Sequence, residues 1–207
     1  MNKISHQTKG VEPSPSKRQQ ILDAAYIVFS RKGFYRATVD EIIALADTGK
    51  GTVYNYFDNK EQLFYTLVRE RSRPFELALK KVQESSEPPL AKIQAMIKLF
   101  LRFYKENADL WRVTMHEMRG FGPHNVAGLT QEQRDKYAAV FRTTIGMLAE
   151  VLQEAVNQGL IKECDTTRVA YGLFSVIVTM IFQNWADDIE ATATTITDIF
   201  LYGVARQ

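Results

Sequence analysis

Apolar side chains recur every three or four residues along almost the whole chain, which is the spacing of one face of a helix. No run alternates apolar and polar residues for long enough to predict a strand. The pattern therefore predicts an all-α fold of about nine helices, in which three short N-terminal helices precede a larger bundle.

Start and stop signals place the first two helices. The first is expected to begin near Ser16 and to end at Gly33, because glycine readily adopts the left-handed conformation that closes a helix. Thr38 and Glu41 have the three-residue spacing of a capping box, which predicts the start of a second helix.

The next two helices are marked by a tight turn and a polar cap. A short third helix is expected over about residues 50–57, and Asp58 or Asn59 caps a longer fourth helix. Pro74 is expected to bend or break that helix unless it lies in the first turn of a new one, because proline lacks the backbone N–H that a helix interior uses. Two helices joined by a tight turn predict a helix-turn-helix within this N-terminal region.

Five more helices are predicted for the rest of the chain. The apolar stretch 169–186 is marginal in length for a membrane span and contains several polar residues, so it is interpreted as a buried helix and no membrane association is expected. The expected domains are a flexible tail (1–15), a helix-turn-helix domain (16–62) and a ligand-binding and dimerisation domain (63–207). The five helices are expected from Pro88-Pro89 to about Lys105, over about Ala108–Met118, from a capping box of Thr130 and Gln133 to Asn157 with Gly159 as its stop, over 166–186 behind Asp165, and over about Thr192–Ala205.

Charge and cysteine content narrow the class of protein. The net charge is only +2, and the excess lies in the first 66 residues, which carry 9 Lys and Arg against 7 Asp and Glu. This permits DNA binding by the N-terminal region without demanding it. Cys164 is the single cysteine, so no intrachain disulfide forms and a reducing, cytoplasmic location is expected.

A helical wheel of residues 48–57 separates an inner face from an outer one. Val53 and Phe57 are four residues apart and point toward the small core. The opposite strip is slim and polar, bordered by two phenol groups, and the next helix begins with Lys60 near its N-terminus. Such a strip suits a DNA major groove, although a solvated surface helix would show the same pattern. The strip consists of Thr48, Gly51, Thr52 and Asn55, with Tyr54 and Tyr56 on its flanks.

The stretch from Arg18 to Phe64 resembles the DNA-binding region of the tetracycline-repressor (TetR) family of bacterial regulators. About 45 of the 207 residues carry the resemblance, in ILDAAYIVFSRKGFYRATVDEIIALADTGKGTVYNYFDNKEQLF. It implies that Lys50, Gly51, Thr52 and Asn55 face the bases, and that Thr38, Tyr54, Tyr56 and Lys60 hold the DNA backbone. The chain departs from the usual Ala-Gly-Val-Ser before Lys50: it has Asp47, Thr48 and Gly49 after Ala46, so Gly49 replaces the N-cap serine.

The resemblance also implies that the C-terminal two thirds bind a small, largely hydrophobic effector and form a homodimer. The last two helices are apolar on more than one side, which favours a twofold interface through them. Aromatic and methionine residues at helical spacing fit an effector pocket or a plain core. His116 and Arg119 fit either ligand contacts or structural roles. The candidate effector-binding residues are Phe100, Phe103, Tyr104, Trp111, Met115, His116, Arg119, Phe141, Tyr171 and Phe174.

The predicted function is a ligand-responsive transcriptional regulator, most simply a repressor that binds a pseudo-palindromic double-stranded DNA operator. An enzyme is disfavoured, because the chain has no GxSxG, P-loop, HExxH or CxxC motif. No metal or cofactor is expected, because no two histidines have ligand spacing and Cys164 has no close His or Cys neighbour. An activator, or an architectural helical protein without ligand control, remains the alternative.

Overall fold

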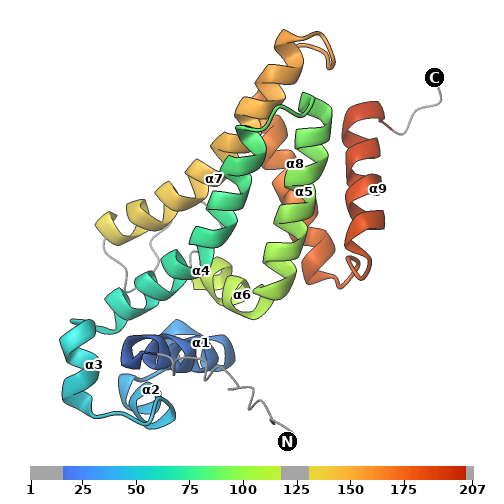
Figure 1. Ribbon diagram of the computed structural model, residues 1–207. Coiled ribbons are helices and arrows are strands. Elements are labelled where there is room, and N and C mark those ends of the chain that lie inside the picture. Colours follow the sequence, from blue (N-terminus) through green and yellow to red (C-terminus); the bar gives the residue numbers. More distant parts are fainter. Residues whose placement is uncertain (1–15, 118–130, 204–207) are drawn as a thin grey trace, which may run out of the picture.

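The computed structural model describes residues 16–117 and 131–203 of the 207-residue chain. The regular secondary structure of these described residues is entirely helical, which confirms the all-α prediction (Figure 1). The helices are α1 (Lys17–Arg36), α2 (Val39–Leu45), α3 (Lys50–Tyr56), α4 (Lys60–Gln83), α5 (Pro89–Glu106), α6 (Ala108–Glu117), α7 (Gln131–Asn157), α8 (Thr166–Phe182) and α9 (Ile189–Tyr202).

The predicted caps of the N-terminal helices are present. The Thr38 hydroxyl accepts a hydrogen bond from the Glu41 amide at 3.3 Å, and the Glu41 carboxylate accepts one from the Thr38 amide at 3.1 Å. Asn59 caps α4 by accepting a hydrogen bond from the Gln62 amide at 2.8 Å. Gly33 has a φ of 76°, so regular helical geometry is interrupted where the first helix was expected to end, although helical turns resume to Arg36.

Three phenylalanines tie the N-terminal helices to α4. Phe64 of α4 lies 4.9 Å from Phe29 and 5.1 Å from Phe34, measured between ring centroids, and all three rings are buried. Edge-to-face and tilted aromatic packing of this kind adds to the gain from burial alone. The base of α4 is therefore part of the core of α1, and α4 runs on across the expected domain boundary at residues 62–63.

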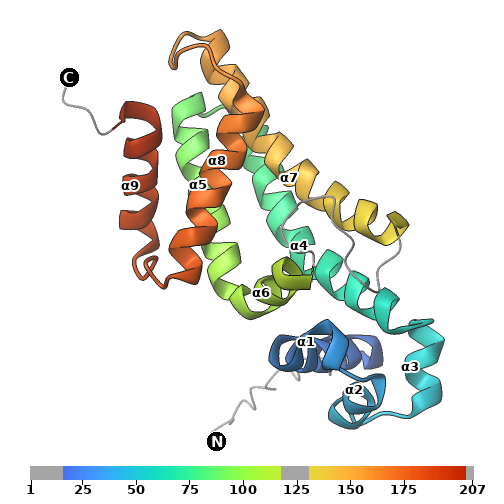
Figure 2. The same ribbon diagram turned by 180° about the vertical axis from the view of Figure 1, so that it is seen from behind.

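Helix α4 bends along its length and connects the two parts of the molecule (Figure 1). Pro74 lies inside this helix. The helix bends but does not break there, because it continues to Gln83 (Figure 1). The N-terminal part of α4 packs on α1, and α4 also contacts α5 and α7. Helix α6 contacts α1 as well, so two elements of the bundle touch the first helix (Figure 2).

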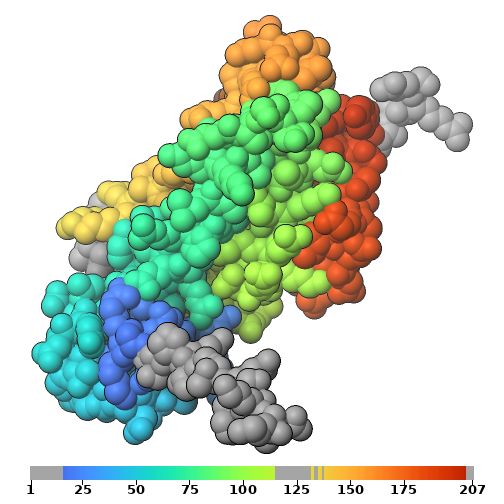
Figure 3. All heavy atoms as spheres, in the orientation of Figure 1, coloured from blue at the N-terminus to red at the C-terminus, as the bar shows by residue number. Residues whose placement is uncertain are grey.

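The larger bundle is built around α5. This helix contacts α4, α7, α8 and α9, and its inner residues are fully buried. Figure 3 shows α4 and α5 side by side on one face of the molecule, with α9 beyond α5. None of the helices in the described ranges has the length and hydropathy needed to cross a bilayer. The buried α5 residues include Ile93, Met96, Ile97, Phe100 and Leu101.

The ends of the last two helices differ from the prediction. Helix α8 ends at Phe182 instead of residue 186, because the chain turns at Asn184, whose φ is 56°. Helix α9 begins at Ile189, where Asp188 caps it. It ends at Tyr202 instead of about residue 205, because Gly203 has a φ of 75° and closes the helix. The expected capping box at Thr130 lies outside the described residues.

Candidate nucleic-acid interface and bundle core

The inner face of α3 holds this short helix in place. Val53 is 1% exposed and Phe57 is 3% exposed, and both belong to the core that α1, α2 and α4 share. The guanidinium group of Arg18 lies over the Phe57 ring, 5.7 Å from its centroid. The predicted inward direction of these two side chains is therefore confirmed, and α3 presents its other side to solvent.

The outer side of α3 is a polar surface, which we call the α3 strip: Thr48, Lys50, Gly51, Thr52, Tyr54, Asn55 and Tyr56. All are exposed except Thr48 and Thr52, which are half-buried. A Cβ atom at Gly51 would meet no atom within 4 Å, so packing within the chain does not require a glycine there. The structure thus brings the strip together as the wheel predicted, with Thr38 exposed at the start of α2.

Two lysines near the strip have different environments. Lys50 forms an exposed ion pair with Asp40 of α2, with 3.2 Å between Nζ and Oδ1. Lys60 is half-buried, and its ammonium donates to the carbonyls of Phe34, Tyr35 and Ala37 at 2.9, 3.4 and 3.0 Å. An ammonium has three donors, and all three are used. Lys60 therefore braces the turn between α1 and α2 in the DNA-free chain, and its phosphate contact stays a prediction.

The turn before α3 is made by Asp47 rather than by a glycine. Asp47 has a φ of 47°, in the left-handed region, and its carbonyl accepts a hydrogen bond from the Lys17 ammonium at 3.3 Å. Aspartate tolerates this conformation better than most residues do. Gly49 has an extended backbone and caps α3 without a side-chain hydrogen bond. Asp47 therefore makes the turn of the helix-turn-helix in place of the usual glycine.

Seven of the ten candidate effector-binding residues belong to one continuous aromatic cluster in the bundle. Tyr104 lies near its centre, 5.0 Å from Trp111 and 5.4 Å from Phe174 between ring centroids. Phe174 also contacts Phe141 at 4.7 Å, and Phe141 contacts Tyr171, which is partly exposed. Met115 and His116 lie on α6, but their side chains are outside the described residues, and so is Arg119. The cluster residues are Phe100, Phe103, Tyr104, Trp111, Phe141, Tyr171 and Phe174.

Sequence reasoning missed Phe75 of α4. Its ring stacks on Phe103 at 4.3 Å with an angle of 1° between the planes, and it contacts Phe100 at 5.0 Å. The available signal was its spacing: Phe75 follows Val68 by seven residues, so it continues the inner stripe of α4 beyond Pro74. Phe75 extends the aromatic cluster from α5 to α4.

Polar atoms are buried inside this aromatic cluster. Burial raises the pKa of the Tyr104 phenol far above its usual value, so the hydroxyl stays protonated and can donate a hydrogen bond. The indole Nε1 of Trp111 is buried and has no hydrogen-bond acceptor among the described residues. Buried N–H groups are normally paired, so an unpaired one in a cluster of this kind fits an acceptor brought by a ligand.

Comparison with known proteins decides the family. A family model described as "Bacterial regulatory proteins, tetR family" matches residues 21–66, and a second, described as "Tetracyclin repressor-like, C-terminal domain", matches residues 86–204. The chain belongs to the tetR family of bacterial regulatory proteins. It is a DNA-binding transcriptional regulator, which is the function that the sequence predicted.

Among tetR-family relatives, the chain is 26% identical to a fatty acid metabolism regulator protein of Bacillus subtilis over 201 residues, covering 91% of this chain and 95% of the relative. Its fold is similar to that of the transcriptional regulator FadR from Bacillus subtilis in complex with stearoyl-CoA, with a TM-score of 0.74, 23% identity and coverage of 90% and 99%. It is also similar to AibR in complex with isovaleryl coenzyme A and operator DNA, with a TM-score of 0.73, 21% identity and coverage of 90% and 98%.

The two tetR-family matches divide the predicted sites between them. The first contains every residue of the α3 strip together with Thr38 and Lys60, and the second contains every candidate effector-binding residue. Residues 67–85 belong to neither match. This segment is α4 after its first seven residues together with the two residues that follow the helix, and it includes Pro74 and Phe75.

Proposed function

We propose that this tetR-family regulator is a repressor that binds a pseudo-palindromic operator as a homodimer and is released by a fatty acyl thioester of coenzyme A. The α3 strip carries the proposal, because a slim polar surface flanked by two tyrosines fits the major groove. The fatty acid metabolism regulator among its relatives, and the stearoyl-CoA and isovaleryl-CoA bound by two similar structures, support the choice of effector.

The α3 strip divides into base-reading and phosphate-holding residues. We assign Lys50, Gly51, Thr52 and Asn55 to the base edges, because they lie at the centre of the strip or can reach it. Tyr54, Tyr56 and Thr38 can donate hydrogen bonds to the phosphates from its borders. Gly51 permits a close approach of the helix to the groove, which agrees with the empty space where its Cβ atom would lie.

The effector would bind in the aromatic cluster of the bundle. An acyl chain would gain from burial among Phe100, Phe103 and Phe174. The Trp111 indole N–H and the Tyr104 hydroxyl could donate hydrogen bonds to a thioester carbonyl. Because α4 contributes Phe75 to the cluster and also packs on α1, occupancy of the cluster can change the position of the helix-turn-helix.

The homodimer would form through α8 and α9. These helices leave large apolar side chains in solvent: Trp185 between them is 64% exposed, and Ile199 and Tyr202 of α9 are 42% and 61% exposed. A twofold interface would cover such residues and place two α3 helices for two half-sites. The effector would then act by a population shift between dimers whose α3 helices match the operator spacing and dimers whose helices do not. A bacterial repressor of this kind would work in the cytoplasm.

Selection of bound sequences from a random DNA library tests the DNA-binding part. A pseudo-palindromic motif is expected, and adding an acyl-CoA should release the selected DNA. Asn55→Ala should relax the base preference at defined positions, by about 1–3 kcal/mol for a lost bidentate contact. Tyr56→Phe should weaken binding to all sequences alike. A flat selection with folded, dimeric protein would overturn the proposal of a sequence-specific repressor.

A further inference from the structure

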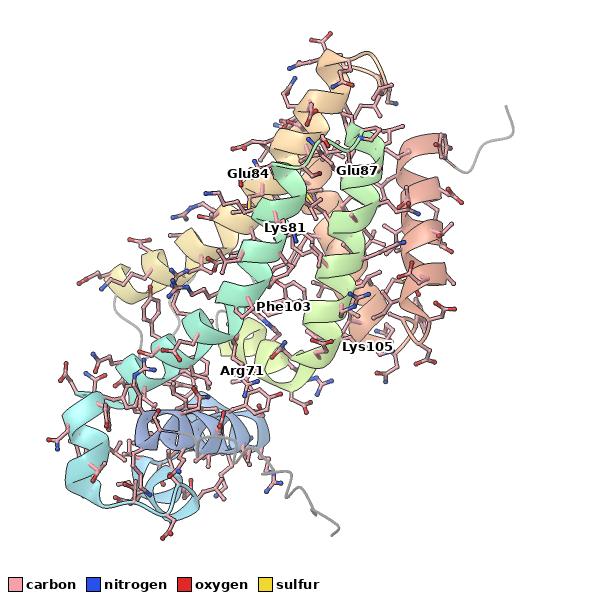
Figure 4. All side chains as sticks on the ribbon, in the orientation of Figure 1. Arg71, Lys81, Glu84, Glu87, Phe103 and Lys105 are labelled. Atoms are coloured by element: carbon pink, nitrogen blue, oxygen red, sulfur yellow. The ribbon has the colours of Figure 1, made fainter. Side chains whose placement is uncertain are left out.

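A surface groove lies between α4 and α5 beside the bend at Pro74. It has a volume of about 360 Å³, and both helices line it. Its apolar lining includes Pro74, Phe75, Leu99 and Phe103. Figure 4 shows Phe103 in the region between α4 and α5, with Arg71 closer to α1. The stacked rings of Phe75 and Phe103 therefore belong both to the groove and to the buried aromatic cluster.

The groove is amphipathic. Two guanidinium groups border its apolar lining, one from Arg71 of α4 and one from Arg102 of α5. Two carboxylates also line it, but that of Glu70 is already bound by Arg18 of α1. Glu106 is the other carboxylate of the lining. The Arg102 guanidinium lies 4.0 Å from the carboxylate of Glu190 on α9, which the Lys98 ammonium binds more closely at 2.5 Å. An apolar surface that ends in two arginines suits a molecule with an apolar chain and an anionic group.

Arg71 also holds the first helix of the DNA-binding domain. Its guanidinium lies 3.6 Å from the Asp23 carboxylate and 4.4 Å from the centroid of the Tyr26 ring, both on α1. A separation of 3.6 Å is an ion pair but is too long for a hydrogen bond. The side chain is also 40% exposed. An anion that makes direct hydrogen bonds to Arg71 can therefore compete with Asp23 for the guanidinium group.

We propose that the α4–α5 groove binds the anionic part of an amphipathic effector and that Arg71 transmits this binding to α1. The inference rests on the proposed function, because it concerns the same effector. The apolar chain would pass the Phe75–Phe103 pair into the aromatic cluster, while a phosphate or carboxylate stays at Arg71 and Arg102. Withdrawal of Arg71 from Asp23 and Tyr26 weakens one of the contacts that hold α1 against α4. The groove wall on α4 lies in the segment that neither family model covers.

Charge variants in the groove test the site, with oleoyl-CoA, oleate and free coenzyme A as probes. Arg102→Gln should weaken binding about tenfold, as expected for one lost hydrogen bond between charged groups. Glu106→Gln should tighten binding, because it removes the opposing charge. Arg112→Gln is the matched control: this arginine is exposed on α6, pairs with Asp109 and does not line the groove. Dissociation constants are measured by calorimetry, and circular dichroism verifies folding.

The three probes identify the source of the anion. If a phosphate occupies the groove, Arg102→Gln affects oleoyl-CoA and free coenzyme A and leaves oleate unchanged. If a carboxylate occupies it, the same substitution affects oleate. Either result supports the groove site. Unchanged affinities for all three probes in both Arg102→Gln and Glu106→Gln would overturn it. Tighter binding to Arg102→Gln and weaker binding to Glu106→Gln would also overturn it, because that pattern indicates a cationic group in the groove.

Asp23→Asn tests the link to α1, because Asp23 contacts Arg71 but does not line the groove. Weakening this contact should lower operator affinity without effector and raise effector affinity, since coupling between two sites is reciprocal. Unchanged operator and effector affinities in Asp23→Asn would remove Arg71 from the coupling.

Failure of this inference is distinct from failure of the proposed function. If no acyl-CoA released the wild-type protein from its operator, the proposed effector itself would be wrong, whatever the groove variants show.

Discussion

Lys60 begins α4, but its ammonium group contacts a turn more than twenty residues earlier in the chain. Lys60→Met keeps the length of the side chain and removes the three donors to Phe34, Tyr35 and Ala37. We expect the free energy of unfolding to fall by about 1–3 kcal/mol, because partly buried carbonyls lose their partner. Urea denaturation of the DNA-free protein measures this change.

Lys50→Met is the control for Lys60. Its ammonium pairs with Asp40 across an exposed surface, where ion pairs contribute at most about 1 kcal/mol. We therefore expect near wild-type stability for Lys50→Met but weaker operator binding. The reverse pattern for Lys60→Met, with unchanged stability and weak binding to all DNA, would support the predicted phosphate contact of Lys60 and contradict its structural role.

Trp111 can report on the effector directly, because the only other tryptophan, Trp185, can be replaced by phenylalanine, which keeps a large apolar side chain at the proposed interface. In a Trp185→Phe background, ¹⁵N-indole NMR shows the Nε1–H of Trp111 alone. Saturation with oleoyl-CoA should move this resonance, because the unpaired N–H gains an acceptor. Trp111→Phe should weaken effector binding about tenfold. A resonance that stays in place at saturation would contradict a hydrogen bond from Trp111.

Residue roles were predictable from the sequence only where neighbours in the chain decide them. The α3 strip and the buried positions of Val53 and Phe57 follow from helical spacing alone. Lys60, by contrast, depends on carbonyls of the preceding turn, and Arg71 depends on Asp23, 48 positions away. The contacts of Lys60 and Arg71 depend on how α4 packs on α1, which the spacing of residues along the sequence does not specify.

At the scale of elements, the starts of α2 and α4 were predicted more reliably than the bounds of α9 and the end of α8. The capping box of α2 and the cap of α4 use side chains within three residues of the helix start, so the sequence reveals them. Helix α8 ends early because Asn184 adopts a left-handed conformation. The Lys105 ammonium of α5 then holds the following turn by donating to the carbonyls of Ala186 and Asp187 at 2.8 and 3.0 Å. The end of α8 therefore depends on a tertiary contact, which the local sequence does not reveal.

The capping box makes the stability of α2 depend on pH. The hydrogen bond from Lys32, and then that from the Thr38 amide, lower the pKa of Glu41 below its usual range. A lowered pKa in the folded state means that the stabilisation is complete above the unfolded pKa, about 4.3, and is lost as the pH falls through the folded pKa. We therefore expect the wild type to exceed Glu41→Gln in urea midpoint at pH 7, with the difference shrinking toward pH 3.

Glu163→Gln serves as the matched control for Glu41, because Glu163 is exposed between α7 and α8 and lies outside the capping box. Its urea midpoint should follow the wild type throughout the titration. A constant difference between Glu41→Gln and the wild type from pH 7 to pH 3 would show that the carboxylate charge does not stabilise α2. The glutamine itself can still accept the hydrogen bond from the Thr38 amide.

For the whole molecule, the decisive question is how one chain with one short reading helix could bind an operator tightly. A dimer binds two half-sites at once, and linking two binding events raises overall affinity by about 10²–10⁴-fold without new contacts. Ile199→Glu places a charge on the exposed side of α9. We expect light scattering to show monomers, and operator affinity to fall toward that of a single half-site while α3 stays intact.

Leu77→Glu distinguishes loss of the interface from a general effect of surface charge. Leu77 is 59% exposed and lies on α4, which packs mainly on α1, α5 and α7 rather than on α8 or α9. This variant should remain dimeric and bind the operator as the wild type does. A half-site probe completes the test, because Ile199→Glu and wild type should bind it equally well if the substitution acts only through dimerisation. If Ile199→Glu stayed dimeric, the twofold interface would have to lie on another surface, and α8 and α9 would need a different reason for their exposed apolar side chains.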